Sequence, residues 1–125
     1  MIEQHLKVIA EEFQFPFNHL NKVLSVNLTP PFTVQLKDGQ LKFLGFLPEI
    51  AKDKLEEGYL QCMKLNLALQ SCVSATIGLT ADEKLTLSAD LFYALDYKML
   101  KESVETFANH LDKISSMLQD SNKEK

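Results

Sequence analysis

The residues best suited to chemistry are scattered along the chain. None of the three histidines, His5, His19 and His110, has a second metal ligand at a helical or hairpin offset, so the sequence predicts no metal site. Adjacent carboxylates such as Glu11 and Glu12 lie in polar stretches, where solvation explains them. The sequence has no Gly-x-Ser-x-Gly elbow, glycine-rich phosphate loop or Cys-x-x-Cys pair. We therefore expect neither catalysis nor a bound cofactor.

The two cysteines, Cys62 and Cys72, are ten residues apart in a stretch that we expect to be helical. With a rise of about 1.5 Å per residue they would lie roughly 15 Å apart, which is too far for a disulfide unless the helix breaks between them. We expect both to be reduced and buried as small apolar side chains.

The charge balance argues against nucleic acid as a partner. The 125-residue chain carries 13 lysines, no arginine and 17 acidic residues, for a net charge of −4. Nucleic-acid-binding domains normally present a basic face rich in arginine, whose planar group binds phosphate through two hydrogen bonds. The N-terminus lacks the basic and apolar regions of a signal peptide, and no apolar run is long enough to span a membrane. We expect a cytoplasmic protein without stable membrane insertion.

The elements that would position functional groups begin with an amphipathic helix. Ile2, Leu6, Ile9 and Phe13 share one face of this helix. Aromatic residues then recur at every second position as far as Phe17, which indicates extended chain.

A β-hairpin is predicted next. Residues 32–37 and 40–43 alternate apolar and polar side chains, and Asp38 and Gly39 between them favour the positive φ angles of a tight turn. Residues 44–47 could form a third strand.

Residues 54–72 predict a helix that is apolar around most of its circumference. Such a helix must be covered on two sides, and in a domain of this size one cover is its own sheet. We favour a second subunit as the other cover. The alternative is a central helix sandwiched within a single chain.

A second hairpin is predicted from residues 73–79 and 85–91, which alternate apolar and polar positions. Asp96 can then cap a final helix whose apolar residues recur every three or four positions as far as Leu118. The residues after Leu118 are polar and are expected to fray.

Together these elements predict one α+β domain over residues 1–118, followed by a polar tail at 119–125. The expected architecture is an antiparallel twisted sheet with helices packed on it. Its order is helix, two strands with an optional third, helix, two strands and helix.

Four phenylalanines, Phe13, Phe15, Phe17 and Phe32, exceed what a short connection needs. They either form an exposed apolar patch for a protein partner or close one end of the core, and the pattern leaves both open. A sheet edge beside such a patch could pair with an extended peptide.

The order of several short motifs resembles the class I type III secretion chaperones, the family that includes the Tir chaperone. The motifs cover residues 55–118, while the N-terminal half is similar by pattern. They are Leu65-Asn66-Leu67, Ile77-Gly78-Leu79, Leu85-Thr86-Leu87, the approach from Leu91 to Leu95, and Val104, Glu105 and Phe107. Two features depart from the family: the final helix has no tryptophan, and the stretch from Phe13 to Phe32 is long.

The resemblance implies a homodimer of α/β protomers in the bacterial cytoplasm. Such a protein keeps the N-terminal segment of one or more secreted effectors extended and non-globular, without hydrolysing nucleotide. It then delivers the effector to the secretion apparatus, whose ATPase is a further implied partner.

Carried onto this sequence, the resemblance assigns two sets of residues by element. The dimer contacts would be Leu55, Tyr59, Met63 and Leu67. The effector-binding grooves would contain Leu6, Ile9, Phe13, Phe15, Phe17, Phe32, Val34 and Leu36.

Two other functions remain open. One is a generic protein-interaction module of the same fold outside a secretion system. The other is a small-ligand-binding or enzymatic α+β domain, which would require a concave pocket with convergent polar groups.

Overall fold

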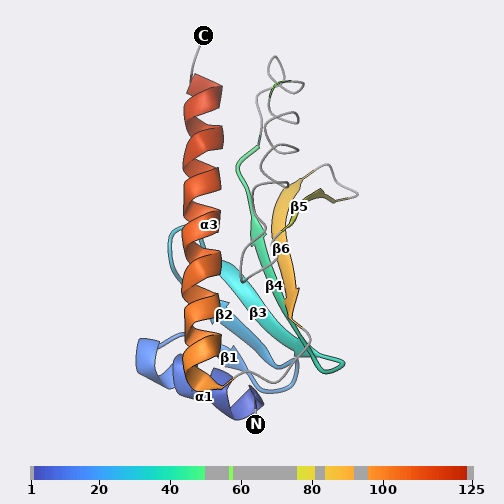
Figure 1. Ribbon diagram of the computed structural model, residues 1–125, viewed down its shortest axis with the longest axis vertical. Helices are drawn as coiled ribbons and strands as arrows, with labels where there is room; N and C mark the ends of the chain where they lie inside the picture. The colour runs from blue at the N-terminus through green and yellow to red at the C-terminus, as the bar shows by residue number, and fades with distance from the viewer. Residues whose placement is uncertain (1, 50–56, 58–75, 81–83, 92–95, 124–125) are drawn as a thin grey trace.

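The computed structural model describes residues 2–49, 57, 76–80, 84–91 and 96–123. These residues form a six-stranded, wholly antiparallel sheet in the order β1-β2-β3-β4-β6-β5. Figure 1 shows the long helix α3 running along one face of the sheet, with α1 crossing beneath the N-terminal end of α3. The elements are α1 (Ile2–Phe13), β1 (Phe17–Asn18), β2 (Val23–Val26), β3 (Phe32–Lys37), β4 (Gln40–Phe46), β5 (Thr76–Leu79), β6 (Leu85–Leu91) and α3 (Tyr97–Lys123). The predicted α+β class and antiparallel sheet are confirmed.

α1 has the predicted bounds, and its end is set by local geometry. Gln14 adopts a left-handed φ of 59°, and the N–H of Phe15 donates to the carbonyl of Ala10 at 2.9 Å. This is the hydrogen bond of a Schellman motif, in which a left-handed residue stops the helix and the next residue turns back over it. The chain after Phe13 therefore folds back over α1.

The stretch between α1 and the first hairpin forms β1 and β2, which the sequence pattern did not predict. Asn18 organises the turn between them, because its Oδ1 accepts hydrogen bonds from the N–H groups of Leu20 at 2.9 Å and Asn21 at 3.0 Å. The long connection is thus part of the sheet.

The predicted hairpin is confirmed as β3 and β4, with Asp38 at φ 53° and Gly39 at φ 75°. The third strand expected at residues 44–47 is wrong. β4 continues without a break to Phe46, because Leu44 still pairs with β3 on one side and with β6 on the other.

The core lies between α3 and the sheet. One cross-strand row, Leu24, Val34, Phe43 and Ala89, joins four neighbouring strands and is buried throughout. Phe107 of α3 covers this layer, with its ring centroid 5.4 Å from that of Phe43. The apolar residues expected on this helix are all buried: Leu100, Val104, Phe107, Leu111, Ile114 and Leu118.

The cap of α3 is also as predicted, since Oδ1 of Asp96 accepts the N–H of Met99 at 2.8 Å. The helix continues past Leu118 to Lys123, where fraying was expected. The second hairpin is confirmed as β5 and β6.

The central helix expected at residues 54–72 falls almost wholly outside the described residues. The same holds for both cysteines and for the four residues assigned to the dimer interface, Leu55, Tyr59, Met63 and Leu67. The homodimer therefore remains a prediction.

Candidate functional site

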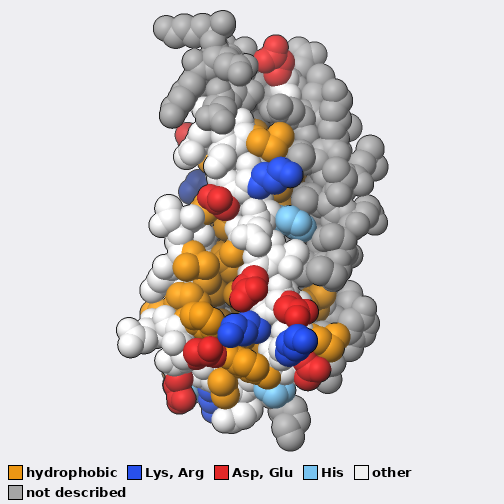
Figure 2. Space-filling view, turned by 60° about the vertical axis from the view of Figure 1, so that its left-hand side comes forward, with side chains coloured by type: hydrophobic (Ala, Val, Ile, Leu, Met, Phe, Trp, Pro, Cys, Tyr) orange, Lys and Arg blue, Asp and Glu red, His pale blue; other side chains and the backbone are white. Residues whose placement is uncertain are grey.

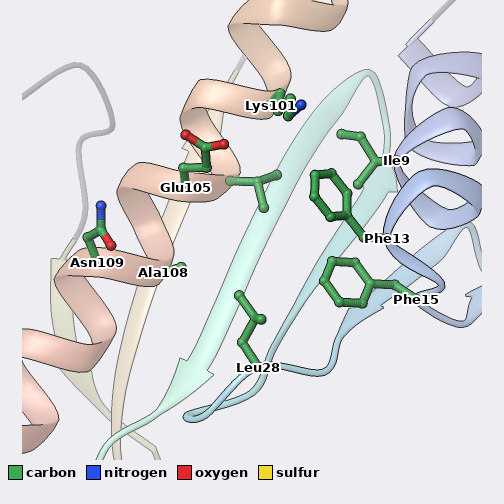
Figure 3. A pocket seen from close by; sticks show the side chains of 9 residues that line it. Ile9, Phe13, Phe15, Leu28, Lys101, Glu105, Ala108 and Asn109 are labelled. Carbon is green, nitrogen blue, oxygen red and sulfur yellow. The ribbon is translucent and has the colours of Figure 1, made fainter.

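A cavity of about 320 Å³ opens between the end of α1, the β2–β3 connection and the first half of α3. We call it the α1–α3 groove. Figure 3 shows Phe13 and Phe15 on one side of it, with α3 opposite. The lining residues are Ile9, Phe13, Phe15, Leu28, Lys101, Val104, Glu105, Ala108 and Asn109. Most of this wall is therefore apolar.

The aromatic wall follows from the turn at Gln14. Because the left-handed residue reverses the chain, the rings of Phe13 and Phe15 lie side by side in a near-parallel stack, 5.7 Å apart with an interplanar angle of 18°. Phe13 remains 43% exposed, and Leu28 across the groove is 46% exposed. Figure 2 shows hydrophobic side chains gathered on the lower part of the molecule with charged side chains beside them. Two large apolar side chains thus face solvent around one concave site.

A polar clamp holds α1 against α3 at the rim of the groove. The carboxylate of Glu12 accepts a hydrogen bond from the hydroxyl of Tyr97 and pairs with Nζ of Lys101 at 3.3 Å. The hydrogen bonds from Tyr97 and Lys101 lower the pKa of Glu12, and the bond to Glu12 raises the pKa of Tyr97. Lys101 also lies 5.2 Å from the ring centroid of Phe13, a cation–π distance. The clamp fixes the width of the groove at one end.

The eight residues assigned to effector binding do not form one surface. Leu6, Ile9, Phe32 and Val34 are buried in the core, although the side chain of Ile9 also reaches the wall of the groove. The ring of Phe32 packs at a tilt of 52° against that of Phe107, with 4.8 Å between the centroids, so this phenylalanine closes the core.

The other four residues are more accessible. Phe13 and Phe15 meet in the groove. Phe17 and Leu36 are half-buried against the core and do not line the groove, and the ring of Phe17 packs edge-on to His19. Of the aromatic series, Phe32 thus closes the core, whereas Phe13 and Phe15 line the groove.

The sequence pattern missed six groove residues, namely Leu28, Lys101, Val104, Glu105, Ala108 and Asn109. That pattern placed Val104 on the apolar face of the final helix and gave Ala108 no role. Leu28 has one local signal, because it is a large apolar residue isolated between Asn27 and Thr29. Its place in the groove depends on the unpredicted strand β2, which it follows in the chain.

The described part of the chain contains neither a metal-binding cluster nor a membrane-spanning helix. Among those residues no three histidine, cysteine, aspartate or glutamate side chains gather closely enough to hold a metal ion. None of the described helices has the length and apolar character needed to cross a membrane.

No protein-family model matches the sequence, and no curated protein matches it significantly. Solved structures do share its fold. A chain of the heterodimeric ExoU–SpcU complex from the type III secretion system of Pseudomonas aeruginosa superposes with a TM-score of 0.70 at 16% identity, covering 96% of this chain and 99% of that chain.

Three further solved structures share the fold. A chain of the ExsC–ExsE complex gives a TM-score of 0.70 at 16% identity and covers 94% of this chain and 92% of its own. A chain of the HopA1–SchA chaperone–effector complex gives a TM-score of 0.64 at 14% identity and covers 92% of this chain and 93% of its own. YbjN from E. coli, described as a candidate transcription regulator, gives a TM-score of 0.65 at 13% identity and covers 90% of this chain and 87% of its own. At these identities the likeness establishes the fold that the sequence resemblance predicted.

Proposed function

We propose that this chain is a type III secretion chaperone of class I. It binds the N-terminal segment of one or more effectors in the bacterial cytoplasm and keeps that segment non-globular until delivery. The observation that carries the proposal is the open apolar groove between α1 and α3, on a fold that the HopA1–SchA chaperone–effector complex shares. The secretion apparatus, through its ATPase, is the proposed recipient of the loaded chaperone.

The physical character of the groove fits a partner that must be held and later released. Apolar contacts from Phe13, Phe15 and Leu28 are non-directional, so they tolerate different partner side chains. Ordering a flexible partner consumes part of the gross interaction energy, which leaves binding reversible. The chain would thus act by binding alone and not as an enzyme.

The proposed functional unit is a homodimer. Its support is the sequence pattern of residues 54–72, which place Leu55, Tyr59, Met63 and Leu67 on a helix too apolar to be covered by one sheet.

The direct test is recovery of the partner. Full-length chain purified from its native cytosol should carry a polypeptide that mass spectrometry identifies as a secreted protein. Deleting the N-terminal segment of that polypeptide should abolish the complex. A complex that survives this deletion, or a chain that carries no polypeptide, contradicts the proposal.

A second candidate function is an interaction module of the same fold that works outside any secretion system; the fold is shared by YbjN, whose described role is in transcription. This candidate predicts a partner that is never exported. The export of the recovered partner therefore separates the two functions.

A further inference from the structure

The face of α3 that lines the α1–α3 groove continues into a second cavity, of about 420 Å³. Six of the α3 residues that line the two cavities follow one another at intervals of three or four along the helix, so they form one stripe. In chain order this stripe contains Lys101, Glu105, Ala108, Asp112, Ser115 and Gln119.

The two cavities adjoin each other. The β2–β3 connection lines both, with Leu28 at the first cavity and Pro30 and Pro31 at the second. The stripe from Lys101 to Gln119 is about 27 Å long at 1.5 Å per residue, a length that an extended chain covers with about eight residues.

The chemistry changes from one end of this stripe to the other. The first cavity is lined mainly by apolar side chains, and α3 adds Lys101, Glu105 and Asn109 to Val104 and Ala108 there. At the second cavity α3 contributes only polar side chains, which are Asp112, Ser115, Ser116 and Gln119. Within the described residues, the carboxylates of Glu105 and Asp112 have no ion-pair partner, and Lys101 is already paired with Glu12. Beyond Lys101 the stripe therefore carries two negative charges, those of Glu105 and Asp112, that no ion pair within the described residues neutralises.

A buried hydroxyl at the second cavity also lacks a partner. Ser115 is only 5% exposed, and its Oγ forms no hydrogen bond with the described residues. Buried polar groups in folded proteins are almost always paired, and Ser115 lines the second cavity, so a polar group that enters this cavity could pair with its hydroxyl.

We infer that one extended partner segment lies along this face of α3. Its apolar side chains contact the aromatic wall of the α1–α3 groove, and its lysine or arginine side chains lie at Glu105, on the α3 side of that groove, and at Asp112. The inference rests on the proposed function and adds the sequence class of the bound segment. That segment has about eight residues, apolar at one end and basic at the other.

The test uses two fluorescent twelve-residue peptides and the full-length chain. Each peptide has alternating valine and serine in one half; the other half alternates serine with lysine in the first peptide and serine with glutamate in the second. Fluorescence anisotropy at low salt should show the lysine peptide binding about tenfold more tightly. The double variant Glu105→Gln, Asp112→Asn should bring the two affinities close together.

A matched control removes the same charge elsewhere. Glu11→Gln with Asp90→Asn alters two exposed carboxylates outside both cavities and should preserve the preference for lysine. Thermal unfolding by circular dichroism should show that both double variants fold like the wild type.

The inference is overturned if the peptides bind equally, if neither binds at millimolar concentration, or if the control has the same effect as the double variant. Leu28→Asp distinguishes this failure from failure of the groove itself. If Leu28→Asp abolishes binding of two peptides that bind alike, the charge preference alone is wrong. If both peptides still bind Leu28→Asp as tightly as wild type, the groove assignment is wrong.

Discussion

At Gly45, α3 approaches the sheet so closely that a side chain has no room. A Cβ added there would lie 2.7 Å from Cδ2 of Leu111 and 3.3 Å from Cβ of Phe32. Leu111 is fully buried, so it cannot move aside without disturbing its neighbours in the core. Gly45 thus sets the distance between α3 and β4, and with it the position of the stripe that lines both cavities.

We predict that Gly45→Ala destabilises the protein by about 1–3 kcal/mol, the usual cost of overpacking. Gly78→Ala is the matched control, because its Cβ would meet only Oγ1 of Thr86 at 3.6 Å, an ordinary contact. Urea unfolding of both variants checks the prediction. Equal free energies of unfolding for the two variants would contradict the close approach.

Among the elements, α1 and α3 are held together by the clamp of Glu12, Tyr97 and Lys101. Because its pKa is lowered, Glu12 contributes stability above its ordinary pKa of 4.5 and loses it as the pH falls through the lowered value. Because its pKa is raised, Tyr97 contributes stability below 10.0 and loses it as the pH rises through the raised value. The clamp should therefore be intact throughout the neutral range.

The corresponding prediction compares melting temperatures across pH. Glu12→Gln should melt below the wild type at neutral pH, and the difference should shrink in acid as the wild-type carboxylate is protonated. Glu11→Gln, an exposed neighbour outside the clamp, is the control. A Glu12→Gln curve that runs parallel to the wild type down to low pH would show that the clamp does not contribute.

Local signals account for the elements that the sequence predicted. The apolar face of α1, the Asp38-Gly39 turn and the Asp96 cap all act within a few residues, and all three are confirmed. β1 and β2 lack such signals. They depend on distant pairing, such as the hydrogen bond from the N–H of Leu36 to the carbonyl of Lys22, which no local pattern encodes.

The candidate site was only partly predictable for the same reason. Alternation suggested that Phe13, Phe15 and Phe17 act alike, but the left-handed Gln14 turns Phe15 back beside Phe13 and separates both from Phe17. Leu28 joins the groove because it lies in the connection that follows β2. Periodicity identifies which residues are apolar, whereas the tertiary fold decides which of them remain exposed.

At the scale of the whole molecule, the proposed dimer gives a prediction of its own. Met63→Glu would place a charge at the predicted interface and should give a monomer or an unfolded chain, because a buried unpaired charge is strongly unfavourable. Lys64→Glu alters the polar stripe of the same predicted helix and should leave the assembly unchanged. Light scattering measures both, and a folded dimer of Met63→Glu would refute the interface.

Binding of the recovered partner to two leucine variants tests the central claim most directly. Leu28→Asp places a charge in the groove, while Leu20→Asp makes the same change at a leucine that is 94% exposed and outside it. Calorimetric titration with the N-terminal segment of the partner should show a loss of at least about tenfold in affinity for Leu28→Asp, equivalent to about 1.4 kcal/mol, and none for Leu20→Asp. Wild-type affinity in a folded Leu28→Asp variant would contradict the claim that the α1–α3 groove holds the partner.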